Sequence, residues 1–493
     1  MVMCIGAGFS NNHKRGGVTM KEDRSFTKLI LTVAIVLTLG YCDSGYPFGW
    51  DSFEVGGYIR NETSMRLRDA NELLWSENIF QLDVNTTLKP EVAYFYFSGR
   101  LYYDAVYDIQ QSKGFLDDDT NRRELRRYMA TNRVGTQADY VRECYLDLYT
   151  DHFDIRLGKQ QIVWGETDAF KMLDIINPQD IRHFNQDLWE DSRITLWSAK
   201  IDYNPTLNSA LQLVIIPDIR PLYWQPYPGR DHPFTPLSQR VLPPFSLDEH
   251  RVARNLSNTE WGVRWYQNFG SFNYTLNYFR HWTDTPGLYL NLRKFKIDFK
   301  YKRVHSLGGS FSWNFTKFLG LSSVVLRGET VLNLKDLQPA INYSRGGLPE
   351  TVRSDNWNYA LTLQKTFWQP YVLWPSGLDA QFYIFQSVIL DYEDSKTKRY
   401  YLTPQTNAHA DEFETILAVI FTSAYLPGEY LKPQLLVAYK DDGDWWINPG
   451  VSYEWTERIT LFLAAHIYTG PFDGLIGEFQ KSSNILFRIK YGF

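Results

Sequence analysis

Hydrophobic and polar residues alternate along many short stretches of this chain, and the last ten residues show the pattern most clearly. Large apolar side chains occupy every second position there, at Ile485, Phe487, Ile489, Tyr491 and Phe493. The positions between them are Leu486, Arg488, Lys490 and Gly492. Because successive side chains of a β-strand point to opposite faces, this stretch predicts a strand with one apolar, aromatic face and one face that carries two cations.

The same period of two recurs upstream, in residues 53–66, 259–268, 271–279 and 324–333. Charged and amide residues share the predicted polar faces of these and two further strands; they include Arg60, Glu62, Glu143, Asp147, Arg156, Gln160, Arg264, Arg327 and Glu329. A soluble β-sandwich would bury the apolar face, whereas a membrane barrel turns it towards lipid and its polar face towards the lumen. Alternation by itself leaves both folds open.

The N-terminus has the pattern of an export signal. Lys21, Arg24 and Lys28 precede an apolar run of about 11 residues at 29–39, and small or polar residues follow it. A run of this length is too short to cross a bilayer as a helix. We therefore predict a leader at residues 1–44, with Met20 as an alternative start and with the cleavage point open. Its loss would leave Cys144 as the single cysteine.

Two alternatives to a cleaved leader follow from the same segment. One is a single buried or anchoring helix. The other is a lipoprotein anchored through Cys42, although Tyr41 is too large for the residue before a lipidated cysteine.

The export signal and the C-terminal strand together favour the membrane barrel. The pattern predicts an all-β protein, a single transmembrane antiparallel up-and-down β-barrel over 45–493 with about 18 strands, 16 being the alternative count. The strands begin near 53, 80, 91, 138, 153, 192, 209, 259, 271, 303, 322, 356, 378, 413, 430, 445, 457 and 484. Tight turns alternate with long connections at about 104–137, 165–191, 218–258, 334–355 and 390–412, as expected for short periplasmic turns and long outer loops. Residues 288–302 alternate too and predict a loop hairpin or a tall strand extension.

Composition excludes other classes of protein. Aromatic residues make up 16% of the 493 residues, and the mean hydropathy of −0.36 excludes a helical membrane protein. The net charge of −5 gives no reason to expect nucleic acid as a partner. Three cysteines are too few for a disulfide scaffold.

One segment does not fit a plain loop. Arg156, Gly158, Lys159 and Gln160 lead into Trp164-Gly165-Glu166, and Asn177-Pro178 with Asp180 follow. Lys159 falls on the face that should meet lipid, which predicts a bulge or a position near the rim. The polar density of the following stretch predicts that it folds into the lumen.

These three motifs resemble the bacterial outer-membrane family catalogued as domain of unknown function 1302, across about 53–493. Its members share Arg-x-Gly-Arg/Lys-Gln, Trp-Gly-Glu and Asn-Pro-x-Asp. The resemblance implies a porin-like barrel without an agreed substrate. The chain also resembles, more distantly, alginate-export barrels, but it has no long ladder of arginines, so alginate itself is not expected. The C-terminal strand resembles the signal by which the assembly machinery recognises outer-membrane barrels.

Catalytic and metal chemistry are not predicted. The nine histidines form no metal-binding motif, and neither a Gly-x-Ser-x-Gly motif nor a cysteine pair is present. The sequence therefore predicts no enzyme and no cofactor.

The resulting hypothesis is a channel in the outer membrane of a Gram-negative bacterium, for passive diffusion of small or medium solutes, constricted by an inward loop at 165–191. The candidate pore-lining and constriction residues are Glu143, Asp147, Arg156, Gln160, Trp164, Glu166, Asp168, Asp174, Asn177, Asp180, Arg182, Arg264, Arg327 and Glu329. The expected partners are outer-membrane lipid and the barrel assembly machinery. The alternative is a barrel that transports nothing, either a surface protein or a sheath around a partner such as an electron-transfer protein.

Overall fold

Two compact units divide the chain, residues 1–50 and 51–493, and every residue described below belongs to the second. The computed structural model describes residues 53–68, 72–106, 140–167, 171–181, 183–220, 234, 246–291, 294–318, 320–343, 348–368, 377–393, 398–400, 410–426 and 428–493. The predicted leader, residues 1–44, lies outside these residues.

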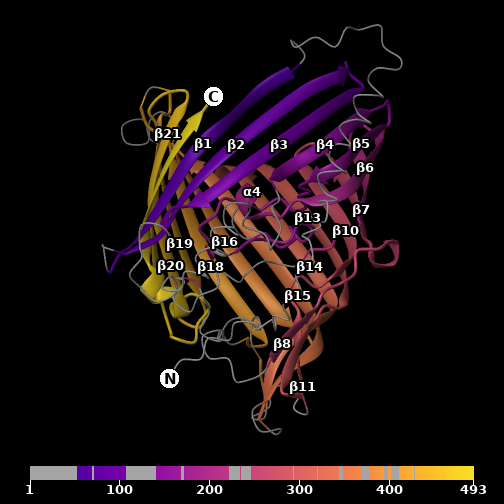
Figure 1. Cartoon of the computed structure of the whole chain (residues 1–493). Coiled ribbons are helices and arrows are strands. Elements are labelled where there is room, and N and C mark those ends of the chain that lie inside the picture. Colours follow the sequence, from indigo (N-terminus) through magenta and orange to yellow (C-terminus); the bar gives the residue numbers. More distant parts are fainter. Residues whose placement is uncertain are drawn as a thin grey trace, which may run out of the picture. The chain divides into compact units, whose positions relative to one another are not determined.

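The described part of the second unit is built from antiparallel strands that each pair with the next in the chain. Eighteen of them form a ring: β1 (Phe53–Arg66), β2 (Leu73–Lys89), β3 (Ala93–Asp104), β4 (Val141–Tyr149), β5 (Phe153–Gln160), β6 (Leu196–Thr206), β7 (Ser209–Ile216), β9 (Glu260–Asn268), β10 (Phe272–Trp282), β13 (Arg303–Phe318), β14 (Leu321–Asn342), β15 (Leu348–Phe367), β16 (Leu378–Ile389), β18 (Phe413–Ser423), β19 (Leu431–Lys440), β20 (Trp445–Glu454), β21 (Ile459–Thr469) and β22 (Asn484–Gly492). The last strand, β22, pairs with β1 and closes the barrel (Figure 1). The predicted up-and-down barrel of about 18 strands is thereby confirmed.

The remaining elements lie in the connections. β8 (Ser246–His250), β11 (Gly287–Asn291) and β12 (Lys296–Lys300) form a separate three-stranded sheet, and β17 (Lys398–Tyr400) pairs with the far end of β14. The helical turns are α4 (Trp189–Ser192), η2 (Leu256–Asn258) and η5 (Gly477–Ser482). Within the described ranges, no helix is long and apolar enough to cross a membrane.

Alternation sets the two faces of the barrel, as the sequence predicts. On β10, Leu276 is 60% exposed on the outer face, whereas its neighbours Thr275 and Asn277 are buried on the inner face. The outer face carries large apolar side chains on strand after strand: Val55, Ile59, Leu101, Leu157, Leu276, Leu307, Trp313, Leu361, Phe382, Leu417, Leu463 and Phe487. The inner face buries polar groups, among them Glu62, Ser64, Glu77, Ser306, Ser310 and Glu329.

One predicted connection differs in length from the structure, and another forms the hairpin that is one of its two predicted forms. The predicted loop 334–355 is mostly strand, because β14 and β15 continue past the barrel as a long hairpin with only residues 343–347 between them. Residues 288–302 form the loop hairpin β11–β12, and its pairing with β8 satisfies the backbone groups of an edge strand that would otherwise be open.

Candidate functional site

The connection between β5 and β6, residues 161–195, is called here the internal segment. Its described residues, 161–167, 171–181 and 183–195, turn into the barrel. It contacts inward-facing side chains of strands on opposite sides of the ring, such as Glu329 of β14, Arg60 of β1 and Tyr468 of β21. Its helical turn α4 lies within the ring of strands (Figure 1). The predicted inward fold of this stretch agrees with these contacts.

A glycine lets the internal segment approach the wall of the barrel. Gly165 has a φ of +96°, a left-handed conformation that side chains other than glycine rarely adopt. A Cβ atom there would lie 2.7 Å from Oε1 of Glu329. Both the positive φ and the close contact with Glu329 therefore favour glycine at this position of the Trp-Gly-Glu motif.

The carboxylate of Glu329 holds the internal segment through four backbone hydrogen bonds. Its Oε1 accepts the N–H groups of Glu166 and Thr167, the latter at 2.6 Å. Its Oε2 accepts the N–H groups of Met172 and Leu173, at 2.8 and 3.1 Å. Glu329 is buried, and its charge is compensated by these donors, which form stronger bonds with an anion than with a neutral acceptor. Its role is thus to anchor the segment to β14.

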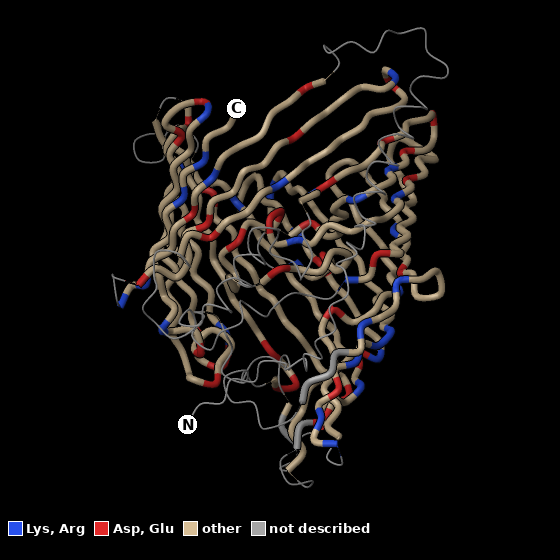
Figure 2. The backbone as a smooth tube through the Cα atoms, viewed as in Figure 1, with Lys and Arg blue, Asp and Glu red and all other residues tan. Residues whose placement is uncertain are grey.

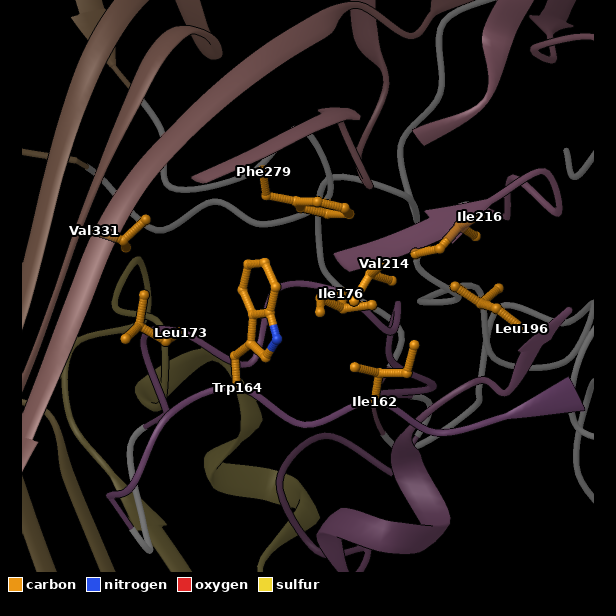
Figure 3. Close-up of a cluster of buried hydrophobic side chains, with 9 residues drawn as sticks. All are labelled: Ile162, Trp164, Leu173, Ile176, Leu196, Val214, Ile216, Phe279 and Val331. Carbon is orange, nitrogen blue, oxygen red and sulfur yellow. The ribbon is translucent and has the colours of Figure 1, made fainter. Parts of the chain in front are cut away.

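An apolar cluster seats the first half of the segment against the inner face of the barrel. The cluster consists of Ile162, Trp164, Leu173, Ile176, Leu196, Val214, Ile216, Phe279 and Val331 (Figure 3). The indole of Trp164 points towards Phe279, with the ring centroids 5.9 Å apart (Figure 3). Its Nε1–H donates to Gln212 of β7 at 2.6 Å, which satisfies the one polar group of this buried side chain.

Polar side chains close the two ends of the segment on each other. The side-chain oxygen of Asn177 accepts the N–H of Ile162 at 2.7 Å, and its amide donates to the carbonyl of Ile194 at 2.8 Å. Asp174 pairs with Arg193 at 2.7 Å. Burial raises the pKa of Asp174, and the bond to Arg193 opposes that rise. Asp180 is buried as well, and its N–H donates to a carbonyl at the end of α4.

A second anchor joins α4 to β1 and β3. Asp191 accepts a hydrogen bond from Arg60 at 2.6 Å and from Arg100 at 2.8 Å. The side chains of Arg60 and Asp191 are 5% and 4% exposed, so this pair is shielded from water. A buried charge without a partner is costly, and each group therefore depends on the other.

The middle of the segment packs against β2 and β21. The ring of His183 stacks on Trp75 with the centroids 4.3 Å apart, and its Nε2 lies 3.2 Å from the carboxylate of Glu77. Gln186 donates to the hydroxyl of Tyr468 at 2.9 Å, and that hydroxyl donates to Asn185 at 2.7 Å. The segment is therefore held at points around the barrel and not only where it enters.

The β21–β22 connection is fixed in a similar way. Asp444, in the turn between β19 and β20, accepts the N–H groups of Ile476 and Gly477 at 2.6 and 3.0 Å. Burial, with the nearby Asp442 as a further cause, raises the pKa of Asp444 to about 6. Ile476 and Phe479 then pack in one apolar cluster with Trp75 and Tyr468.

Several predicted residues line the barrel wall beside the segment. Arg156 binds both oxygens of Asp147, at 2.6 and 2.9 Å. Gln160 donates to two backbone carbonyls, and Glu143 accepts the N–H of Gln161 at 3.0 Å. Lys159 is buried at the end of β5, where its Nζ donates to the carbonyl of Val141 at 2.5 Å. The pairing of β4 and β5 continues without a register shift to Lys159, so no bulge is present in this pair. Of the two predicted explanations for Lys159, its position at the end of β5 is the one that remains.

A half-buried group of three charges lies where the segment faces β9 and β14. Arg264 donates to the carbonyl of Val163 at 3.3 Å, and Arg327 donates to Gln364 at 2.6 Å. Burial raises the pKa of Glu166, and the positive charges of Arg264 and Arg327 oppose that rise. Glu166, Arg264 and Arg327 are thus predicted pore-lining residues that stay partly exposed.

The predicted site residues thus divide into two groups. Glu143, Asp147, Arg156, Glu166, Arg264 and Arg327 are only partly buried. Trp164, Asp174, Asn177, Asp180 and Glu329 are buried and hold the segment in place, and Gln160 is buried at the end of β5. Asp168 and Arg182 lie outside the described residues. No group of three or more His, Cys, Asp and Glu side chains that could bind a metal ion occurs within the described ranges.

The sequence analysis missed the residues that hold the far half of the segment. These are Trp75, Glu77, Arg100, His183, Asp191 and Tyr468. One signal for them was available: alternation places Arg60 and Arg100 on the inner face, and buried arginines there require a carboxylate. Which carboxylate supplies it depends on how the segment folds.

Together these observations define a closed 18-strand β-barrel that carries an anchored internal segment. The chain belongs to the family described as "Protein of unknown function (DUF1302)", which matches residues 68–444. This match confirms the family that the three motifs predicted. No curated protein matches the chain.

Solved structures with a similar chain course share little sequence with this protein. OccAB1 of Acinetobacter baumannii is 9% identical with a TM-score of 0.49, covering 90% of this chain and 95% of its own. OccK3 (OpdO) of Pseudomonas aeruginosa is 9% identical with a TM-score of 0.48, covering 90% and 96%. The Salmonella typhi OmpF complex with daunomycin is 9% identical with a TM-score of 0.41, covering 90% and 97%.

Proposed function

We propose that this protein is an outer-membrane channel for passive diffusion of small or medium solutes, narrowed by the internal segment. The observation that carries the proposal is a barrel with an apolar outer face whose lumen is crossed by a segment anchored on Glu329 and Asp191. A barrel of about 18 strands leaves an aqueous interior unless something fills it. An anchored segment reduces that interior to a passage of constant size, and charged side chains at its edge select solutes.

Ion conductance of the purified protein in planar lipid bilayers tests this function. We expect single-channel steps with the native chain and larger steps after a short Gly/Ser linker replaces residues 163–193. No steps from either form, with a folded barrel in both, would overturn the channel. Copurification of a second protein with the inactive barrel would then favour a sheath around a partner.

Replacing Glu166 with glutamine is expected to shift the reversal potential in a salt gradient towards anion preference. The reason is that Arg264 and Arg327 would lose a nearby negative charge at the edge of the segment. Asp154→Asn is the matched control, because Asp154 lies near the opposite end of β5 and binds Asn204. An equal shift in both variants would show that Glu166 has no special place in the passage.

If the barrel lies in a membrane, the same substitution should have different effects on the outer and inner faces of the β20–β21 hairpin. Leu463 of β21 is 48% exposed on the outer face, while Ser452 of β20 lies on the inner face opposite Phe462. Leu463→Arg is expected to lower the free energy of unfolding by about 2–4 kcal/mol in lipid, because arginine would enter hydrocarbon. Ser452→Arg places the same charge in the lumen and should change the free energy of unfolding by less than about 1 kcal/mol. Urea titration in lipid vesicles measures both, and equal losses would contradict this placement.

The C-terminal strand supports the proposed partners, which are outer-membrane lipid and the barrel assembly machinery. Phe487, Ile489 and Tyr491 on the outer face of β22, and Phe493 directly after it, are between 36% and 45% exposed. β22 is also the strand that closes the barrel on β1. In this proposal the protein is not an enzyme and needs no cofactor.

A further inference from the structure

Cations and aromatic rings meet on the outer face where β9, β10 and β13 reach the long connections. Along β10, Leu276, Tyr278, Arg280 and Trp282 share one face, since they alternate with side chains buried on the inner face. Trp261 of β9 packs against Tyr278 with ring centroids 5.3 Å apart. Arg280 therefore lies between two aromatic side chains at the border of the apolar face.

An open pocket lies next to these strands, at the edge of the apolar outer face. Its volume is about 420 Å³, and its lining includes His250, Val252, Asn258, Trp282, Lys300 and Lys302. Arg303 lies beside Trp282 of this pocket: its guanidinium lies 4.4 Å from the centre of the Trp282 ring and donates to the carbonyls of Ser257 and Thr259. Next to them Leu256 is 89% exposed.

Positive charge exceeds its local compensation here. One carboxylate, Asp298, lies within 3.7 Å of two cations, Lys296 and Lys300, and 3.2 Å from the imidazole of His250. Among the side chains that the structure describes, no carboxylate forms an ion pair with Arg280 or Lys302. Figure 2 shows lysines and arginines gathered over this part of the molecule, beside β8 and β11.

We propose that Arg280, Trp282, Lys302 and Arg303, the basic rim, bind the phosphorylated headgroup of a glycolipid in the outer leaflet. Arginine and lysine are the usual partners of phosphate oxygens. Aromatic side chains mark the depth at which headgroups meet hydrocarbon. The inference goes beyond channel function but rests on the proposed placement in an outer membrane.

A membrane lipid suits this site better than a dissolved anion because the rim continues into the apolar outer face. Tyr278 and Leu276 extend it along β10 towards the middle of the barrel, where acyl chains would lie, and Trp261 lies beside Arg280 on the neighbouring strand. Leu256 gives an exposed apolar contact at the level of the cations. A ligand with phosphates and acyl chains would cover both parts of the surface at once.

Binding of lipid A to the full-length barrel in detergent tests the proposal. We expect bisphosphorylated lipid A to bind the native chain about tenfold more tightly than the Arg280→Ala/Lys302→Ala variant. Dephosphorylated lipid A should bind both proteins equally and as weakly as the variant binds the phosphorylated form. The affinity of the native chain should fall with added salt.

Lys317→Ala/Lys365→Ala is the matched control, because these lysines lie on the strands next to aromatic residues at the end with the short turns. We expect native affinity from this control. Equal binding by all three proteins, or an equal loss in both variants, would overturn the basic rim. Arg280 lies on the outer face of β10, so we expect native conductance from the Arg280→Ala/Lys302→Ala barrel, which keeps this outcome separate from the channel proposal.

Discussion

Replacing Glu329 with alanine is expected to raise the single-channel conductance about twofold. The change removes the acceptor of four backbone N–H groups in the internal segment. A buried donor without an acceptor costs about 1–3 kcal/mol, so together the four are expected to release the segment from β14. Conductance in planar bilayers measures the widened passage, and proteolysis within the segment reports its release.

Two further variants make this prediction specific. Glu329→Gln keeps one acceptor oxygen and should give an intermediate conductance. Asp379→Ala removes a carboxylate that binds Gln364 and Gln381 on β15 and β16 and has no hydrogen bond to the described residues of the segment, so its conductance should stay native. A folded Glu329→Ala barrel with native conductance would show that this anchor does not set the passage.

Replacing Asp191 with alanine is expected to lower the free energy of unfolding by about 3–5 kcal/mol. The loss is large because Arg60, whose side chain is 5% exposed, would keep its charge without a partner, and Arg100 would lose one as well. Urea titration of the barrel in lipid vesicles measures the change. Protease cleavage near α4 should become faster at the same time.

A neighbour on the same helical turn provides the control. Glu190 is exposed, and its backbone carbonyl rather than its carboxylate accepts the hydrogen bond from Arg142. Glu190→Ala is therefore expected to change the free energy of unfolding by less than about 1 kcal/mol. A second test adds Arg60→Ala to Asp191→Ala: it should restore part of the stability, because no buried charge is then left alone, and a further loss would contradict this account.

The barrel could be predicted from the sequence because its strands show a local pattern. Side chains alternate with a period of two, so Leu276 and its neighbours assign the two faces of β10 without knowledge of any other strand. Most predicted strands begin within a few residues of the observed ones, and the largest differences, at β2 and β15, lie on the side of the long connections. There, hairpin pairing beyond the apolar band decides where a strand ends, as β14 and β15 show.

The candidate site was predictable only in part. The Trp-Gly-Glu motif and the polar stretch after it indicated an inward fold, and alternation placed Glu329 on the inner face. Nothing local connects Glu329 to Thr167, since 162 residues separate the carboxylate from the N–H group that it accepts. Asp174, Asn177 and Asp180 were predicted as lining residues for their polarity, but burial makes them braces of the segment.

The sequence by itself determined the strand pattern, the family and the two faces of the wall, because each depends on neighbouring residues or on a short motif. The tertiary structure alone decided which inner side chains remain open to the lumen and which anchor the internal segment. Closure of the ring brings β1, β14 and β21 within reach of one 35-residue connection, 161–195. A carboxylate acquires its role from the donors that this closure places around it, and their positions are a property of the whole barrel.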